Sequence, residues 1–392
     1  MNNGTFIFKQ ISQFLPKDYF EYLVDKYDGN RYVKSFTCWN HFMVMLWAHL
    51  TTRESLRDIT GSLNAHKSKF HHLGFGKSVC RTTLSEANEK RNVEIYRLFA
   101  ERMVEIVQKK KIAVDDLFME GIPHRIFALD STTVTFDLEK FKWSKSHNGK
   151  GGIKIHTLFD ILTSIPVYNI ITDHSVKDAS LMDYFQYESD AFYIFDKAYV
   201  KLFSLSEIDR IGAYFIVRRK KRMNYQIIEE FNCNKDKDGV VRDLKIILSN
   251  RWSKARYKKP LRIVYYYSEE KDCVLEFFTN NLELDAYKIA LLYKCRWQIE
   301  LYFRWIKQHL RIKRFYGISE NAVKTQIYVG ILAYCLVALI GSEYNLKGSP
   351  FELLRTLSVS LFEKENLRDF LICAESSSEN LQSVSNFDLK LF

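Results

Sequence analysis

Three acidic residues stand in sequence contexts where an acid is unusual. Asp130 in IFALDSTT and Asp196 in YIFDKAYV each follow apolar and aromatic residues that predict an interior strand, where aspartate is disfavoured. Glu300 lies in YKCRWQIELYFRWIKQHLRIKRF, residues 293–315, which is otherwise crowded with aromatic and basic residues. Either aspartate alone could simply end a strand and turn the chain. Three carboxylates from separate elements, however, can hold two divalent ions for phosphodiester cleavage.

The segment around Glu300 has helical spacing. On one continuous helix, four polar residues share a narrow strip: Tyr293, Arg296, Glu300 and Lys307. An apolar stripe beside this strip suits packing on a sheet, so Glu300 is expected at the edge of the buried face, near strand ends. Arg296 and Lys307 would then contact phosphates, and Tyr293 would hydrogen-bond a phosphate. Oxygen ligands of this kind suit Mg²⁺ or Mn²⁺.

The pattern along the chain predicts an α/β fold with helical and β-rich parts. Residues up to 118 have mainly helical periodicity, and short β-branched and aromatic runs begin near residue 124. We expect a mixed sheet flanked by helices, interrupted by a β-rich insertion and preceded by an α-helical domain. The predicted parts are 1–118 (helical), 119–212 (core, first part), 213–287 (insertion), 288–372 (core, second part) and 373–392 (loose tail).

Composition favours a nucleic-acid partner. The 392 residues carry a net charge of +11 with a pI near 9.1, although a basic enzyme without a polyanionic ligand has the same balance. Seven scattered cysteines contain no CxxC pair, which argues against a zinc ribbon or a disulfide framework and fits a reducing cytoplasm. The longest apolar run, 327–340, is short for a bilayer and typical of a buried core helix, so no membrane role is expected.

Basic clusters predict a track for the DNA backbone. They lie at 218–222 with Arg218, Arg219 and Lys220, at 254–259, and along the last helix with Arg304, Lys307 and Arg311. Solvated faces are the ordinary alternative for such clusters. Lys154 and His156 are expected to line the site and contact DNA, with a structural role as the alternative for the histidine.

Three further aspartates compete for the metal role. Asp160 in LFDILTS, and Asp173 and Asp178 in ITDHSVKD, occupy contexts typical of turns. We therefore interpret each of them as a hairpin or cap residue.

Taken together, these motifs resemble the DDE-type transposases of the insertion sequence four family, which have a ribonuclease H-like catalytic domain. The family signature has four residues at fixed spacing, matched here by Tyr293, Arg296, Glu300 and Lys307. Asp130 before Ser-Thr-Thr and Asp196 within FDKAY match the two aspartate contexts of the family. GKGGIKIHTLFD resembles its Gly-rich segment ending in Lys and His, and SVCRTTLSEANEKR resembles part of its helical leader.

The resemblance implies cut-and-paste transposition on double-stranded DNA. Water would nick the transposon end, the freed 3′ hydroxyl would form a hairpin, and after its opening the ends would join target DNA. Asp130, Asp196 and Glu300 would hold two Mg²⁺ ions, for which Mn²⁺ can substitute. A homodimer would synapse two ends, and the helical N-terminal domain would recognise the terminal repeats, with packing and dimerisation as its alternative role.

Two tryptophans are also implicated by the resemblance. Trp297 matches a Trp that follows the signature Arg in related enzymes. Trp252 in NRWSKARYKK is the candidate for an insertion aromatic that stacks on a flipped base, because a tight hairpin cannot keep every base paired. The more common alternative for Trp252 is a half-buried strand aromatic.

Two other functions remain open from the sequence. A ribonuclease H-like nuclease would share the acidic triad but hydrolyse DNA without strand transfer. An inactive, domesticated DNA-binding protein would have no need of three convergent acids, whose mutual repulsion must be offset.

Overall fold

The computed structural model of the chain describes residues 4–110, 125–144, 151–220, 223–233, 239–309 and 315–382. Within these ranges the residues form two compact units. One unit draws on residues 1–112, 134–152 and 303–391 and is helical apart from the end of a strand. The other draws on 113–133 and 153–302 and contains most of a large sheet.

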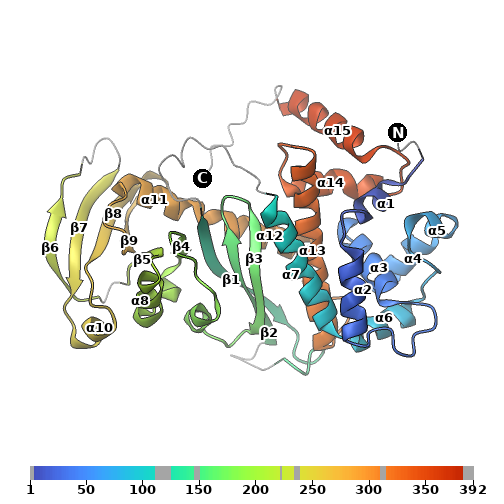
Figure 1. Cartoon of the computed structure of the whole chain (residues 1–392), viewed down its shortest axis with the longest axis horizontal. Helices are drawn as coiled ribbons and strands as arrows, with labels where there is room; N and C mark the ends of the chain where they lie inside the picture. The colour runs from blue at the N-terminus through green and yellow to red at the C-terminus, as the bar shows by residue number, and fades with distance from the viewer. Residues whose placement is uncertain are drawn as a thin grey trace. The chain divides into compact units, whose positions relative to one another are not determined.

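The sheet has nine strands in the order β3-β2-β1-β4-β5-β9-β8-β7-β6 (Figure 1). The strands are β1 (Ile126–Phe136), β2 (Gly151–Asp160), β3 (Ile165–Asp173), β4 (Phe192–Phe195), β5 (Tyr214–Arg218), β6 (Tyr225–Phe231), β7 (Val240–Leu248), β8 (Leu261–Ser268) and β9 (Cys273–Thr279).

The first five strands form a core of the type that the sequence predicted. β4 pairs in parallel with both β1 and β5, and β2 pairs antiparallel with β3. This order and these directions are ribonuclease H-like, so the predicted fold class is confirmed.

The remaining strands extend the same sheet instead of forming a separate layer. β6, β7, β8 and β9 pair antiparallel in succession, and β9 pairs with β5. The sequence placed residues 214–218 in the insertion, but β5 pairs with β4 and thus completes the core. Parallel pairing explains the difference, because it depends on a partner strand that local composition cannot reveal. The domain boundaries themselves stay a prediction.

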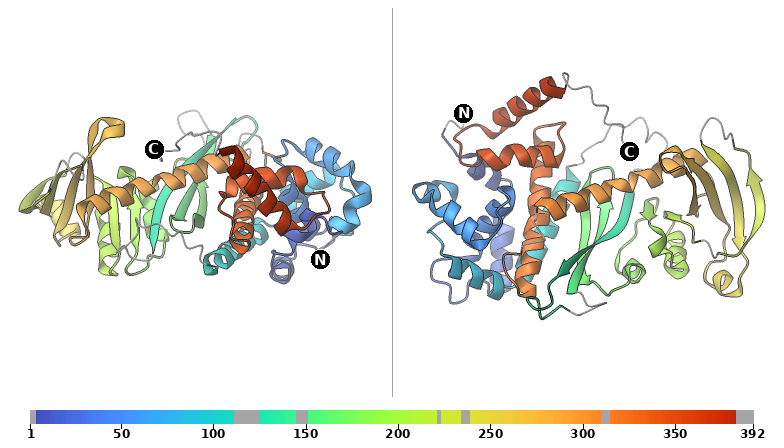
Figure 2. Two further views of the ribbon diagram at one scale, coloured as in Figure 1. Left: turned by 90° about the horizontal axis from the view of Figure 1, so that it is seen from above. Right: turned by 180° about the vertical axis from the view of Figure 1, so that it is seen from behind.

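Helices cover both faces of the central strands. Phe127 and Leu129 of β1 pack in one cluster with Leu205 and Ile208 of α8 (Leu202–Arg210). The alternate residues of β1 face the other way, as the period of two in a strand requires. α11 (Ala286–Cys295) packs on β5, β7, β8 and β9, and Figure 2 shows it crossing the sheet on the face away from α8. Burial on both faces explains the continuous apolar run FYIF of β4.

The helical unit confirms the predicted α-helical character of the first 118 residues as far as residue 110. Its helices are α1 (Ile7–Ser12), α2 (Lys17–Lys26), α3 (Cys38–Leu50), α4 (Leu56–Asn64), α5 (Phe70–Leu73), α6 (Arg81–Lys90), α7 (Val93–Lys109), α13 (Glu320–Glu343), α14 (Pro350–Ser360) and α15 (Leu367–Gln382). α13 packs against α3, α6, α7 and α14, so helices from both ends of the chain share one core.

α13 is the buried helix that the apolar run predicted, although it is longer than that run. Its 24 residues are long and apolar enough to cross a membrane by length and composition alone. However, 94% of its most apolar window is buried inside the protein, which is typical of a core helix.

The first half of the segment predicted as a loose tail is helical. Residues 373–382 continue α15, and 383–392 lie outside the described residues. The Ser-rich composition of this segment lowers helix propensity only slightly, so the helix is not prevented.

Candidate active site

The strand register places two of the predicted acids next to each other. Leu129 of β1, Phe195 of β4 and Val217 of β5 lie side by side. The next residues along the chain are Asp130, still within β1, Asp196, which directly follows β4, and Arg218, the last residue of β5. Neighbouring strands lie about 4.8 Å apart, and residues in matched register on parallel strands face the same side. Asp130, Asp196 and Arg218 therefore form a row across the centre of the sheet.

Asp130 is not at a strand end, as the sequence suggested. β1 continues to Phe136, whereas its pairing with β4 stops at Leu129. The same prediction is right for Asp196, which directly follows the last residue of β4.

Glu300 reaches the site from a helix that starts beside the sheet. The segment from Tyr293 onward was predicted as one helix, but α11 ends at Cys295 and α12 spans Trp297–His309. Arg296 lies at the junction, where its N–H donates to the Tyr293 carbonyl three residues back. Glu300 is in the first turn of α12, where an acid is favoured by the helix dipole.

Arg296 joins two of the three acids. Its Nη1 donates to Asp130 Oδ2 at 2.7 Å, and its Nη2 donates to Glu300 Oε1. The exposed fractions of these side chains are 15% for Arg296, 20% for Asp130 and 31% for Glu300. Partly buried hydrogen bonds between charged groups are among the stronger polar contacts in proteins, so this bridge holds α12 against β1.

The electrostatics of Asp130 confirm that the acids are close. Burial raises the pKa of the Asp130 carboxyl to about 6, and Arg296 and the Ser131 N–H oppose this rise. The nearby charges of Glu300 and Asp196 raise the Asp130 pKa further. Glu300 and Asp196 thus both act on the Asp130 carboxyl, as expected where a cation is to be bound.

The donor set suits a hard divalent cation, but the present arrangement is bridged by arginine. Across the described ranges, no three His, Cys, Asp or Glu side chains stand close enough together to hold a metal. Asp130 and Glu300 bond different nitrogens of one guanidinium, and this keeps the two carboxylates apart. Carboxylate oxygens are the ligands that Mg²⁺ and Mn²⁺ prefer, so the residues fit such an ion once Arg296 is displaced.

The two aromatic residues of the signature region lie on either side of Arg296. Tyr293 is 9% exposed, and its ring lies 5.8 Å from the Arg296 guanidinium carbon. Burial raises the pKa of the Tyr293 phenol to about 12, with Asp196 adding to the rise and Arg296 and Arg218 opposing it. Trp297 is 42% exposed and so presents an aromatic surface to solvent.

Lys154 and His156 lie inside the fold. Lys154 Nζ donates to the Val176 carbonyl at 2.9 Å and to Asp178 Oδ1 at 3.1 Å. His156 is fully buried, with Nε2 2.9 Å from Thr172 Oγ1. No DNA strand can reach His156 in this conformation, which leaves the structural alternative for that residue.

The basic residues predicted for the insertion differ in their exposure and in their partners. Arg219 pairs with Glu276 and lies over the Tyr225 ring, whereas Lys220 is exposed and donates to a backbone carbonyl. Trp252 is 74% exposed on α10 (Arg251–Arg256). The alternative of a half-buried strand aromatic is therefore wrong for Trp252.

The basic residues of α12 form an exposed surface as far as it is described. Arg304 and Lys307 are both exposed on this helix. Arg311, which the sequence added to the same track, lies outside the described residues.

Sequence reasoning missed one acid beside the site. Asp178 was interpreted as a turn residue, and it does begin the short helix η3 (Asp178–Tyr184). Its carboxylate also accepts hydrogen bonds from Ser131 and Lys154. No signal in the sequence indicated this contact, because Ser131, Lys154 and Asp178 are far apart along the chain.

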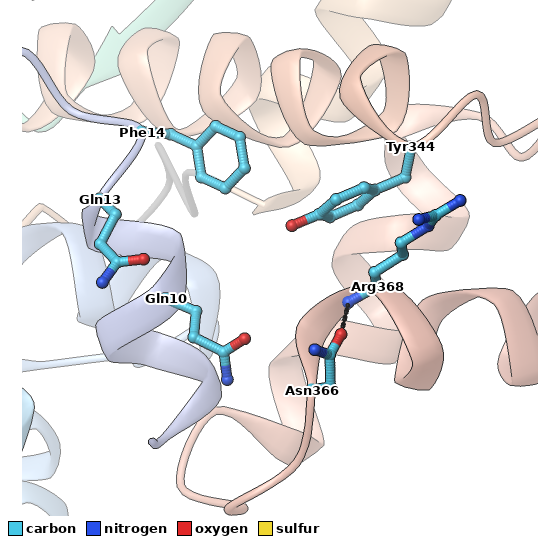
Figure 3. Close-up of a pocket in the computed structure, with 6 residues that line it drawn as sticks. All are labelled: Gln10, Gln13, Phe14, Tyr344, Asn366 and Arg368. Atoms are coloured by element: carbon cyan, nitrogen blue, oxygen red, sulfur yellow. Dashed lines mark hydrogen bonds between the residues drawn. The ribbon is translucent and has the colours of Figure 1, made fainter. Parts of the chain in front are cut away.

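A pocket of about 410 Å³ lies in the helical unit and is separate from the acids. Figure 3 shows the six residues that line it: Gln10, Gln13, Phe14, Tyr344, Asn366 and Arg368. Gln10 donates to the carbonyls of Thr5 and Glu365 and accepts from the Leu367 N–H. These bonds tie α1 to the start of α15, so the pocket marks a structural junction.

A ribonuclease H-like sheet with one aspartate in β1, a second directly after β4 and a glutamate from a later helix is the arrangement expected from the resemblance to DDE-type transposases. The family described as "Transposase DDE domain" matches residues 121–336, more than half of the chain. The chain belongs to this family, and the predicted resemblance to insertion sequence transposases is confirmed. Residues 3–76 match a family described as a domain of unknown function.

Three relatives carry similar names. A putative transposase of Sinorhizobium fredii is 35% identical over 57% of this chain and 64% of its own length. A probable transposase for insertion sequence element IS5377 of Geobacillus stearothermophilus is 26% identical over 55% of this chain and 56% of its own length. A putative transposase for insertion sequence element IS4SA of Synechocystis is 26% identical over 77% and 84%. The chain thus spans less than two thirds of the first two relatives.

Among solved structures, the piggyBac transposase synaptic complex with hairpin DNA is similar. The identity is 10%, the TM-score is 0.46, and the match covers 97% of this chain and 85% of the other.

Proposed function

We propose that the chain is a transposase that binds the ends of an insertion sequence and carries out metal-dependent DNA cleavage and strand transfer. The observation that carries the proposal is the row of Asp130 and Asp196, which directly follow the last paired residues of the parallel strands β1 and β4, with Glu300 linked to Asp130 through Arg296. Carboxylates forced together across a sheet are costly unless a cation shares them. Family membership supports the same reading.

Asp130, Asp196 and Glu300 would hold two Mg²⁺ ions, or Mn²⁺ in their place. Ions bound there would activate the attacking oxygen and neutralise the leaving oxygen. Arg296 would release Asp130 and Glu300 as the site fills and would turn its guanidinium toward a DNA phosphate, for which its bidentate geometry is suited. This exchange keeps the charges of the acids balanced both before and after loading.

The exposed basic residues supply the DNA contacts in this proposal. Arg218 follows Asp196 in the row and is half-buried; among the described residues it forms no ion pair, so its charge is available to a phosphate next to the acids. Arg304 and Lys307 on α12 would continue the backbone track. Trp252 would stack on a base extruded from a hairpin end, a role that its 74% exposure supports.

The assembly belongs to the proposal as well. Two copies would bind two ends and synapse them as a homodimer, in the cytoplasm, with target DNA entering after cleavage. The N-terminal helices would contribute recognition of the terminal repeats.

The test compares Glu300→Gln with a matched control, Glu270→Gln. Glu270 is an exposed acid in the same unit, paired with Lys294 at 2.9 Å and distant in sequence from the acids of the site. A duplex containing the DNA that flanks the gene is incubated with each protein and Mg²⁺. We expect the parent protein and Glu270→Gln to nick it and Glu300→Gln to lose at least about 100-fold in rate. Equal cutting by both variants would remove Glu300 from the mechanism.

A second measurement separates transposition from simple hydrolysis. Pre-cleaved ends with a free 3′ hydroxyl are offered together with a supercoiled target plasmid. Joined products support a transposase, whereas cutting without joining would identify a nuclease and overturn the strand-transfer part of the proposal.

A further inference from the structure

A polar cluster lies behind Asp130, on the opposite face of β1. Asp178, the first residue of η3, accepts a hydrogen bond from Ser131 Oγ at 2.8 Å on its Oδ1. The same oxygen accepts from Lys154 Nζ of β2 at 3.1 Å. Three segments that are distant in sequence thus meet on one carboxylate oxygen.

Ser131 connects this cluster to the candidate site. The Ser131 backbone N–H donates to Asp130 Oδ1 at 2.8 Å. Side chains of consecutive strand residues point to opposite faces, so Ser131 faces Asp178 while Asp130 faces Arg296. Anchoring the Ser131 side chain therefore limits rotation of the strand at the peptide whose N–H holds Asp130.

The surroundings of the cluster are dry. Lys154 and Asp178 have side chains 17% and 24% exposed, and His156 is fully buried with Nδ1 3.8 Å from Asp178 Oδ1. Tyr199 is 1% exposed, and burial raises the pKa of its phenol, with the charges of Asp130 and Asp178 raising it further. The charges of Asp130 and Asp178 thus both act on the buried Tyr199 phenol.

Charge balance explains why Lys154 points inward. A partly buried carboxylate is costly unless it is paired and hydrogen-bonded, and Lys154 together with Ser131 provides both. Lys154 is then occupied in the fold, which differs from the DNA contact expected of it from the sequence.

We propose that Asp178 is a positioning residue of the candidate site. It fixes Asp130 through Ser131, while Lys154 neutralises the charge of Asp178. The proposal rests on the function proposed above, because Asp130 must hold a metal for its position to matter. Partners of this kind behind a metal ligand typically change metal affinity or activity by about 10–100-fold when they are removed.

A nearly equivalent acid in the same short helix provides the control. Asp183 of η3 pairs with Lys201 and accepts from Ser204 Oγ at 2.6 Å, but no contact described for it involves Asp130 or Ser131. Asp178→Ala and Asp183→Ala each remove one acid from η3, together with its contact to one lysine and its hydrogen bond from one serine. Any general effect on the stability of η3 should therefore appear in both variants.

The experiment measures Mn²⁺ binding to the full chain by the electron paramagnetic resonance of free Mn²⁺, and the Mn²⁺ dependence of end cleavage. We expect Asp178→Ala to weaken Mn²⁺ binding and to raise the Mn²⁺ concentration for half-maximal cleavage by about 10–100-fold, with DNA affinity unchanged. Asp183→Ala should match the parent protein. Equal Mn²⁺ binding by both variants, or equal impairment of both, would overturn the proposal.

Two milder substitutions cover the case in which Asp178→Ala fails to fold. Asp178→Asn keeps an oxygen that accepts from Ser131 and should recover much of the lost Mn²⁺ affinity. Ser131→Ala removes only the link between Asp178 and Asp130 and should behave like Asp178→Ala. A Ser131→Ala protein with parental Mn²⁺ binding would contradict the proposed linkage.

Asp130→Asn distinguishes this inference from the function on which it rests. If Asp130→Asn binds Mn²⁺ as tightly as the parent protein, the proposed metal site fails and the inference fails with it. If Asp130→Asn loses Mn²⁺ while Asp178→Ala and Ser131→Ala keep it, only the positioning role is refuted.

Discussion

Replacing Arg296 by methionine tests whether its guanidinium occupies the place of a metal. Methionine keeps an unbranched side chain at the junction of α11 and α12 but removes the positive charge between Asp130 and Glu300. The two carboxylates then repel each other and Asp196 in a partly buried region. We expect the metal-free variant to be less stable than the parent protein.

The size of the loss follows from burial. Removing one partner of a fully buried ion pair costs about 3–5 kcal/mol. Asp130 and Glu300 are 20% and 31% exposed, so solvent screens part of their repulsion. We therefore expect a loss of about 2–3 kcal/mol. For units of this size the loss corresponds to a fall in Tm of about 4–12 °C.

Mn²⁺ distinguishes this loss from ordinary destabilisation. Thermal unfolding is followed at increasing Mn²⁺ concentration, because a ligand that binds only the folded state raises Tm. Mn²⁺ should restore much of the Tm of Arg296→Met and should raise the Tm of the parent protein less, since binding to the parent must first displace Arg296.

The control is Arg262→Met. Arg262 forms a more deeply buried pair with Asp243, with bonds of 2.8 and 2.6 Å and side chains 6% and 4% exposed. This variant should lose at least as much stability, and Mn²⁺ should not restore it. The reasoning is refuted if Mn²⁺ raises the Tm of Arg296→Met no more than that of the parent protein or of Arg262→Met.

Two further predictions concern residues away from the acids. Burial lowers the pKa of His41, whose Nδ1 is 2.6 Å from the Tyr96 hydroxyl, from 6.5 to about 3. The folded state therefore favours neutral His41. Its contribution to the free energy of unfolding is complete above pH 6.5, and about 2 kcal/mol of this free energy is lost by pH 5 because His41 becomes protonated in the unfolded chain. The free energy of unfolding of His41→Gln, measured with urea, should depend less on pH over this range than that of the parent protein. The same pH dependence in both proteins would contradict the lowered pKa of His41. Hydrogen bonding to Thr82 lowers the pKa of the exposed Cys80 thiol to about 7, so iodoacetamide should label Cys80 before Cys273 at pH 7, as mass spectrometry can check. Equal labelling rates would argue against a lowered thiol pKa.

The sequence predicted the acids because their local contexts are unusual. An aspartate directly after a buried apolar run, as at Asp130 and Asp196, conflicts with strand burial and so draws attention without any knowledge of partners. The fold class was also predictable, since β-branched runs with helical segments between them favour a mixed sheet flanked by helices. The register that sets Asp130 beside Asp196 was not, because it depends on which strands pair and where β4 ends.

The partners of Arg296 could not be predicted in the same way. A helical projection treats residues 293–307 as one rod and places Arg296 on a strip facing phosphate, whereas the chain breaks between α11 and α12 at this residue. An arginine near an acid suits a carboxylate and a phosphate equally well in chemical terms. The fold decides which partner it has, and here Arg296 donates to two acids of the site, Asp130 and Glu300.

The geometry of Asp130 shows why such support is hidden from sequence reasoning. Its Oδ2 is held by Arg296 on one face of β1, and its Oδ1 accepts from the Ser131 N–H, whose side chain is anchored by Asp178 on the other face. Neither Ser131 nor Asp178 has an unusual local context, because a serine in a strand and an aspartate in a turn are both ordinary. Their role arises only when the fold brings three segments together at one carboxylate. A candidate catalytic acid can thus be proposed from its own neighbours in sequence, whereas the groups that hold it in position are found only in the folded chain.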